Sequence, residues 1–588
     1  MQEESLRLRA LRVGALPILN HFIDRMGLAA ELTLALKNPS YADALLALIK
    51  NIVVERNALY AVGEWAALYD VGLVAQGKIG DDRLGRALDR LFAADRATLQ
   101  TRIVLAAIKG FDLKMQEIHN DTTSVMVRGA YDGQNPKAVQ LKRGHSKERR
   151  PDLKQLVYSL CITADGAVPV HFKAYDGNQT DDGIHLETWN RLRALLQHPR
   201  FIYVADCKLC TEKNLRTIDA EHGLFVTVVP KTRSEVETFS DAVLGGDVRW
   251  EEILRKRADR DEKAFDVIEC AVGPYHLREG FMLYWYRSSQ KKKRDARDRD
   301  ERIERTIERL ESLDLRRMRE PKTDAAIGKR VAEVIAQHHA EEWITVEVKW
   351  DTVEKFKAIT RGKPTAETAF RRITQRLPRL HVTTNAEKIA QSAAMDGIFP
   401  LTTNTKEKPV DVFKIYKYQP RIEKRHALLK STFEVAPIWL KKNTRIEALM
   451  FLEFVAQMLA ALVERALRQK MAERNIDILC SLPEGRASKT PTIEQVLRLF
   501  EHQNKHALYD GERLIKQFAD PLTPVQSQIL QLLSVSTAVY GPGTSPTTRG
   551  HAPQVLHDQG AECRLCLLHV GSLVLSESVL EFKWRDLR

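Results

Sequence analysis

The sequence predicts an α/β protein in which a core of strands and helices is interrupted by a large insertion, with an all-helical N-terminal region and a helical C-terminal region. Apolar residues recur every three or four positions through the first 110 residues, as they do in amphipathic helices. Short runs of the strand type occupy residues 113–230 and return at 397–403. The intervening residues 231–395 are heavily charged, so we expect them to form the insertion.

The length of the chain sets the expected number of domains. A chain of 588 residues with 44% hydrophobic side chains is too long for one core, and roughly three to four domains are expected. We divide the sequence into a helical N-terminal domain (1–110), the first part of the core (111–230), the insertion (231–395), the second part of the core (396–475), a helical C-terminal region (476–540) and an irregular tail (541–588).

Strands and helices alternate in the first part of the core. The step Asp165-Gly166 joins two strand-type runs and is typical of a hairpin turn. A helix and two further strands follow the hairpin, which is the order expected of an α/β fold. The predicted elements are strands at 156–162, 168–174, 201–205 and 224–229 and a helix at 186–196.

The insertion combines a charged helix with a strand. A basic run at 291–294 leads into a helix with an apolar seam at Ile303, Ile307 and Leu310, and residues 343–350 alternate as strands do. The helix could belong to a solvated helical hairpin or to an arm dedicated to binding nucleic acid. We prefer the hairpin, because charge runs on helices are usually solvated.

The charge balance favours a polyanionic partner rather than a membrane. The net charge is +13, from 91 Lys and Arg against 78 Asp and Glu, as in many proteins that bind nucleic acid. The most apolar stretch, 446–463, is interrupted by Glu447 and Glu453, so we expect a buried core helix there. The first residues lack the basic-then-apolar order of a signal peptide, which favours a cytoplasmic protein.

The seven cysteines do not resemble a disulfide framework, because their number is odd and they are spread over a long chain. Two Cys-x-x-Cys pairs occur, Cys207 with Cys210 and Cys563 with Cys566. Neither has a second pair at zinc-finger spacing, so we expect reduced thiols and no structural zinc.

Two aspartates follow predicted strands of the core. Asp121 comes after the alternating segment 113–119, and Asp206 directly follows the strand 201–205. Open α/β sheets place their functional sites at the carboxyl ends of strands. Carboxylates brought together there can bind the two Mg²⁺ ions of metal-assisted phosphoryl transfer.

A third carboxylate belongs to a polar pattern on a predicted helix near 416–430. Tyr416, Gln419, Glu423 and Lys430 are three, four and seven positions apart, which would place all four on one helix face. A face with a phenol, an amide, a carboxylate and an ammonium group is unusual for a packing surface. It suits a helix that meets a phosphate beside a metal ion.

These residues resemble the DDE transposases of bacterial insertion sequences, in the IS-four type of superfamily named for a Tyr, Arg, Glu, Lys signature. The matching motifs are His-Asn-Asp-Thr-Thr-Ser at 119–124, Val-Ala-Asp-Cys-Lys at 204–208, the pattern from Tyr416 to Lys430 and the basic segment 144–155. They occur in family order over residues 113–470. The N-terminal segment 13–18 also resembles the helical domain common in one branch of that superfamily.

The resemblance implies an RNase-H-like catalytic core whose first two acids lie on strands and whose third lies on a helix. Asp121, Asp206 and Glu423 would be the catalytic acids and bind two Mg²⁺, with Mn²⁺ as a substitute. Contacts to double-stranded DNA would come from the N-terminal domain and from two sets of side chains. These are Tyr416, Gln419 and Lys430 near the cut strand, and Lys142, Arg143, Lys147, Arg149 and Arg150 in the overlapping basic segment 142–154.

The activity implied is DNA transposition: a homodimer in the bacterial cytoplasm, at the nucleoid, cuts at terminal inverted repeats and joins the 3′ hydroxyl to target DNA. One position departs from the family, because Gln419 stands where the signature has Arg and cannot neutralise a phosphate. This leaves two alternatives open. The chain could be a decayed or domesticated DNA-binding protein, or a metal-dependent nuclease that does not join strands.

Overall fold

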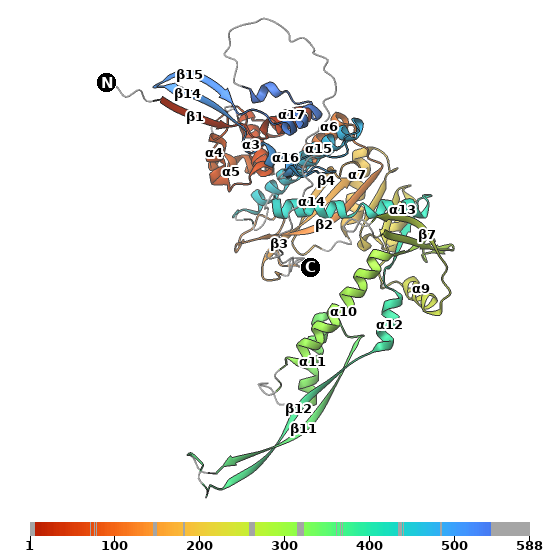
Figure 1. Cartoon of the computed structure of the whole chain (residues 1–588). Coiled ribbons are helices and arrows are strands. Elements are labelled where there is room, and N and C mark those ends of the chain that lie inside the picture. Colours follow the sequence, from red (N-terminus) through yellow and green to blue (C-terminus); the bar gives the residue numbers. More distant parts are fainter. Residues whose placement is uncertain are drawn as a thin grey trace, which may run out of the picture. The chain divides into compact units, whose positions relative to one another are not determined.

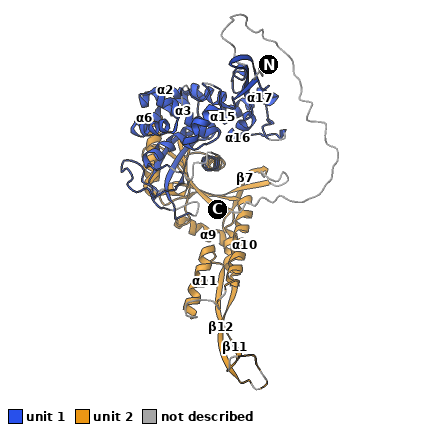
Figure 2. Cartoon of the chain, turned by 90° about the vertical axis from the view of Figure 1, so that its left-hand side faces the viewer, with its two compact units in different colours: residues 1–115, 120–180, 420–588 blue, residues 116–119, 181–419 orange. Residues whose placement is uncertain are grey.

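The computed structural model describes residues 6–70, 72–75, 77, 79–144, 150–179, 183–257, 265–313, 315, 323–359, 362–364, 366, 368–432, 438, 440–482 and 485–541. The chain divides into two compact units, which Figure 2 shows in blue and orange. Unit 1 comprises residues 1–115, 120–180 and 420–588, and unit 2 comprises 116–119 and 181–419. The irregular tail predicted from 541 onward lies outside the described residues, apart from Gly541.

Helices of unit 1 pack around the long helix α15 (Asn443–Glu473), as expected for a buried core helix. By length and composition this helix could also cross a membrane, but 94% of its apolar window is buried inside the fold. The surrounding helices begin at local signals: Pro39 starts α3, and the Asn38 side chain accepts hydrogen bonds from two backbone N–H groups of its first turn. They are α1 (Leu16–Arg25), α2 (Leu28–Leu36), α3 (Pro39–Val54), α4 (Val62–Ala67), α5 (Asp81–Ala93), α6 (Arg96–Phe111), α16 (Ile493–Phe500) and α17 (Pro524–Leu532).

A small sheet corrects the prediction that both ends of the chain are helical. Strand β1 (Leu6–Arg12) pairs with β14 (Asn504–Asp510), which pairs with β15 (Arg513–Ala519), all antiparallel. Most side chains of β1 and β15 are exposed, although the sequence of β1, Leu-Arg-Leu-Arg-Ala-Leu-Arg, starts with the apolar and polar alternation of a strand. The pairing joins opposite ends of the sequence, and no local pattern predicts it.

The predicted hairpin of the core is present in unit 1. Strands β3 (Lys154–Thr163) and β4 (Pro169–Tyr175) pair antiparallel, and β3 also neighbours β2 (Glu117–Val127), whose residues from Asn120 onward belong to this unit. The turn contains Gly166 and Ala167 with φ of 83° and 54°. A side chain on Gly166 would collide with that of Arg465, so the turn requires glycine there.

Unit 2 contains the larger part of a mixed sheet, which confirms an α/β structure. Residues Glu117 to His119 of β2 pair in parallel with β5 (Ile202–Ala205), and β5 pairs in parallel with β6 (Leu224–Val228). Strand β13 (Ile398–Thr403) follows antiparallel, and then β10 (Met282–Ser288), β8 (Phe265–Ala271) and β7 (Trp250–Arg257), with β9 (Tyr275–His276) beside β10. Helices α7 (Ile184–Leu196), α8 (Glu212–Ala220), α9 (Ser234–Gly245) and α13 (Pro409–Lys417) belong to the same unit.

The segment assigned to the insertion has two kinds of structure. Strands β7 to β10 extend the core sheet through β13, whereas the later residues form a separate apolar cluster. In that cluster the helical pair α10 (Ser289–Glu311) and α11 (Asp324–His338) packs against a two-stranded ribbon, β11 (Ile344–Ala358) and β12 (Phe370–Thr384) (Figure 1). Helix α12 (Ala386–Ala394) leads back to β13. The strand predicted at 343–350 is present and continues to Ala358.

Candidate active site

Asp121 lies inside a strand, not at its end as the sequence pattern predicted. Strand β2 continues to Val127, because threonine and valine, which favour strands, follow the aspartate. The Asp121 side chain is 21% exposed, and its Oδ1 accepts a hydrogen bond from the backbone N–H of Thr122 at 2.8 Å. Its Oδ2 lies 3.6 Å from Nε2 of His426.

His426 lies on helix α14 (Pro420–Ala427), three residues after Glu423. Its ring is buried and makes an edge contact with Tyr158 of β3, whereas Glu423 is exposed in the first turn of the helix. Residues three apart on a helix are neighbours on its surface. Within unit 1, His426 therefore brings the helix of the third acid next to the strand of the first.

Asp206 directly follows β5, as the sequence predicts, and its side chain is 47% exposed. Its Oδ1 accepts a hydrogen bond from the backbone N–H of Lys208 at 3.1 Å, and its carbonyl accepts one from the Thr227 hydroxyl at 2.7 Å. Nε2 of His185 lies 3.7 Å from Oδ1. His185 is buried on α7, with its Nδ1 3.2 Å from the Tyr203 hydroxyl.

The two histidines are the residues that the sequence analysis missed. A Glu-x-x-His spacing on a helix was visible in the sequence and could have drawn attention to His426. His185 gave no such signal, because it stands 21 positions before Asp206 and only the packing of α7 brings it to the acid.

The prediction that Tyr416, Gln419, Glu423 and Lys430 share one helix face is wrong. Helix α13 ends at Lys417, and α14 begins at Pro420. Proline lacks the N–H that a continuous helix would need, and it disfavours a helical conformation in the residue before it. Lys430 lies further along in a π-helical turn, Leu428–Thr432.

Gln419 is buried beside His119 of β2. Its Oε1 lies 2.8 Å from Nδ1 of that histidine, whose Nε2 lies 2.7 Å from Oε1 of Glu117. The His119 ring also contacts Tyr418, with centroids 5.1 Å apart. The amide at the position of the family arginine is therefore held inside unit 2. Tyr416 is half-buried against the apolar cluster of the sheet.

The basic segment is described only in part, and Lys147 and Arg149 lie outside the described residues. Lys142 forms an ion pair with Asp176 at 2.9 Å, and Arg143 is exposed. Arg150 donates two hydrogen bonds to Asp152, which lower the pKa of that carboxyl to about 2. Its guanidinium is therefore shared with a neighbouring carboxylate.

The donor chemistry suits Mg²⁺, since the predicted ligands are three carboxylates. Among the described residues, however, no three His, Cys, Asp or Glu side chains are grouped closely enough to hold a metal ion. Burial raises the pKa of the Cys210 thiol to about 12, so this side chain is a protonated, unreactive thiol in the described fold. The pair Cys563 and Cys566 lies outside the described residues.

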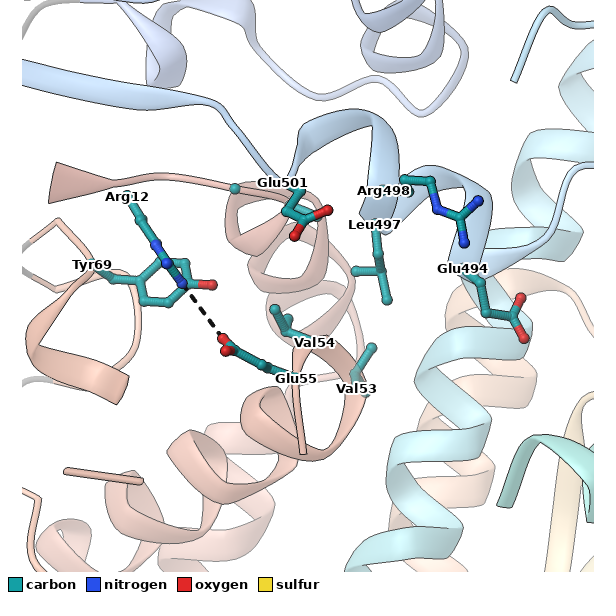
Figure 3. A pocket seen from close by; sticks show the side chains of 11 residues that line it. Arg12, Val53, Val54, Glu55, Tyr69, Glu494, Leu497, Arg498 and Glu501 are labelled. Carbon is teal, nitrogen blue, oxygen red and sulfur yellow. Dashed lines mark ion pairs between the residues drawn. The ribbon is translucent and has the colours of Figure 1, made fainter. Parts of the chain in front are cut away.

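A pocket of about 320 Å³ in unit 1 does not coincide with the acids (Figure 3). It lies where the end of α3 meets β1 and α16, and an ion pair of 3.6 Å between Arg12 and Glu55 crosses its wall. Glu494, Arg498 and Glu501 line it from α16 and the turn that follows. Neither Asp121 nor Glu423 lines it.

Comparisons with known proteins give weak structural likeness and no match in sequence. No protein-family model matches the chain, and no curated protein matches it. Among solved structures, the chain is similar to a piggyBac transposase in a synaptic complex with hairpin DNA, with a TM-score of 0.24 and 11% sequence identity. The match covers 46% of this chain and 59% of that chain, which is less than two thirds of its length. The chain is thus a mixed α/β protein with a weak structural likeness to a transposase.

Proposed function

We propose that this protein is a DNA transposase that cuts at transposon ends and joins the 3′ hydroxyl to target DNA. Asp121, Asp206 and Glu423 are its catalytic acids and bind two Mg²⁺ ions, which Mn²⁺ can replace. Bound metal ions supply an activated nucleophile and stabilise the leaving oxygen. Its partners are double-stranded DNA and a second copy of the chain, and it acts in the bacterial cytoplasm.

The parallel pairing of β2 with β5 is the observation that carries the proposal. His119 pairs with Val204, and each strand then reaches an aspartate two residues later, Asp121 in one and Asp206 in the other. The equal offset of two residues from one register pair supports the assignment of both acids to the same reaction. This is the relation expected of two acids that act on one phosphate.

The third acid is supported by the packing of α14 within unit 1. His426 is 3.6 Å from Asp121, and Glu423 precedes it by one helical turn. The residues around Asp121 and Asp206 orient these two carboxylates. Backbone N–H groups bind one oxygen of Asp121 and of Asp206, and a buried histidine faces each of them.

DNA is held near the acids by cations and polar side chains. Lys430 contacts a phosphate as a point charge, and Tyr416 and Gln419 act on the same strand. The exposed Arg143 and the rest of the basic segment contact the phosphate backbone. For Gln419 this role requires a rearrangement that frees the amide from His119.

The test uses full-length protein, Mg²⁺ and duplex DNA that carries the ends of the element flanking its gene. Wild-type protein should produce both cleaved ends and joined products. Asp121→Ala, Asp206→Ala and Glu423→Ala should each lose cleavage by about a thousandfold or more while retaining DNA binding in EDTA. Exposed acids provide matched controls, Asp132→Ala for unit 1 and Asp241→Ala for unit 2. Near wild-type cleavage by any of the three acid variants removes that residue from the assignment.

Two other outcomes identify the alternatives. Binding of the ends without cleavage identifies a decayed DNA-binding protein. The observation that favours this alternative is the burial of Gln419 at the position where the signature has an arginine. Cleavage without a joined product identifies a nuclease. Labelling the 3′ end of the donor strand separates these outcomes, because only strand joining transfers the label to a longer molecule.

A further inference from the structure

The two halves of the β11–β12 ribbon have different surroundings. In the first half, one face is apolar and packs against α10 and α11 through Val346, Val348, Trp350, Leu380 and Val382. Among the described residues of the distal half, which spans 352–376, no side chain belongs to that cluster. Eight residues separate Trp350 from the end of β11, a reach of about 27 Å at roughly 3.4 Å per residue. An isolated two-stranded ribbon of this kind is marginally stable without a partner.

The distal half is strongly basic. Residues 352–376 contain seven Lys or Arg and two Glu. Lys355, Lys357 and Arg371 are all exposed and share one face, because Lys355 and Lys357 are two apart and Lys357 is paired with Arg371. At the paired positions 353–359 and 369–375, all of them described, this face carries no carboxylate.

Direct pairing of two cations across strands costs free energy. Lys357 opposite Arg371 is such a pair. A bound anion between the two cations would offset their repulsion. The opposite face of the distal half carries exposed aromatic side chains, Phe356 at 64% and Phe370 at 50% exposure. Cations on one face and aromatic rings on the other suit nucleic acid, because its phosphates attract the cations and thymine methyl groups in the major groove can contact apolar side chains.

Shape and charge select duplex DNA as the occupant. The major groove is about 12 Å wide and admits a two-stranded β-ribbon. The ribbon of a second copy would bring like charges together and is the poorer partner. We propose that the distal half of the β11–β12 ribbon, called the distal ribbon below, enters a groove of duplex DNA. Lys355, Lys357 and Arg371 then contact phosphates. The inference deepens the proposed function, on which it rests, by assigning a DNA contact that does not involve the three acids.

The test measures DNA binding by the full-length chain in EDTA, as a function of KCl concentration. In the ribbon variant, Lys355, Lys357 and Arg371 are all replaced by Gln. The control variant carries Arg309→Gln, Lys329→Gln and Lys388→Gln on α10, α11 and α12, which removes the same charge from exposed helix positions. Each phosphate contact contributes about 0.9 to the slope of log K against log salt. The ribbon variant should therefore lose about 2 to 3 units of slope and bind at least tenfold more weakly at 0.1 M KCl, with the control close to wild type.

A second variant separates entry into a groove from simple charge attraction. Phe356→Ala with Phe370→Ala should weaken binding several-fold and leave the salt slope unchanged, because no charge is lost. An unchanged slope in the ribbon variant, or an equal change in the control variant, overturns the proposal. So does a ribbon variant that binds DNA normally but changes the mass of the protein in solution, which would identify a protein partner. Because no metal is present, the result does not depend on whether the chain cuts DNA.

Discussion

Helix α15 of unit 1 and the distal ribbon of unit 2 differ in where their charged side chains lie and in what those side chains contact. Within α15, Glu464 is buried against Arg425 at 2.8 Å, and Arg465 is buried against Asp165 and the carbonyl of Phe111. On the distal ribbon the charged side chains that the structure describes are exposed and are mostly of one sign. A charge that finds its partner inside the fold stabilises that fold. A charge left in water remains available to another molecule.

The comparison leads to a ranking of substitutions by expected effect. Removing one member of a buried ion pair leaves an uncompensated charge, whereas removing one member of an exposed pair changes little.

Arg425→Met should lower the free energy of unfolding by about 3 to 5 kcal/mol, because the buried Glu464 would lose its nearest cation and keep only Arg468, whose guanidinium is 3.5 Å away. Arg425 also donates to the carbonyl of Ala167 at 2.9 Å, and this hydrogen bond would be lost too. Urea denaturation followed by circular dichroism measures the change. The control is Arg421→Met, an exposed position on the same helix. Equal midpoints for the two variants would contradict the contrast between buried and exposed charges.

Glu453→Gln should stabilise the protein in alkaline solution. Burial raises the pKa of this α15 carboxyl from 4.5 to about 8, although Arg56 at 3.8 Å opposes the shift. A raised folded-state pKa means that the wild type loses stability as pH rises from 4.5 to about 8, since the unfolded chain releases the proton first. The variant should gain on the order of 2 to 4 kcal/mol over wild type at pH 8.5.

The same comparison at pH 5 is the control for that prediction, because most of the difference should then be absent. Melting temperatures measured from pH 5 to pH 8.5 provide the test. A gain that is constant across this range would show that Glu453 does not titrate in the folded protein.

His426→Ala should lower the rate of DNA cleavage about tenfold, equivalent to about 1.4 kcal/mol, if the ring positions Asp121. The effect should appear in the single-turnover rate at saturating DNA and leave DNA affinity unchanged. His426→Asn, which retains a polar nitrogen, should recover part of the rate. His502→Ala, at an exposed position of unit 1, is the control. A loss of affinity with a normal rate would place His426 in DNA binding instead.

Glu354→Gln should have the smallest effect, less than about 1 kcal/mol, because its ion pair with Arg372 lies on the distal ribbon with both side chains well exposed. Urea denaturation should give a midpoint close to wild type. A large destabilisation would mean that the distal ribbon is part of a folded core, contrary to its exposed surroundings.

Local signals predicted much of the core. The hairpin β3–β4 followed from an Asp-Gly turn between two β-rich runs, and the position of Asp206 followed from the apolar strand before it. The break in the helix near residue 416 was also available from the sequence, since Pro420 marks it. That error came from giving the spacing of four polar residues more weight than a proline in their midst.

Features that depend on a few adjacent residues followed from the sequence alone: strand periodicity, turns, the buried helix α15 and the placement of Asp206 after a strand. Only the tertiary structure decided which distant segments meet. It paired β1 with β14, brought His185 to Asp206 and His426 to Asp121, and gave Gln419 a buried partner in His119. It also left half of a ribbon of two 15-residue strands outside the apolar cluster of α10 and α11, among the described residues. These contacts depend on how whole elements pack, and packing is set by shape and burial summed over the fold rather than by any local pattern.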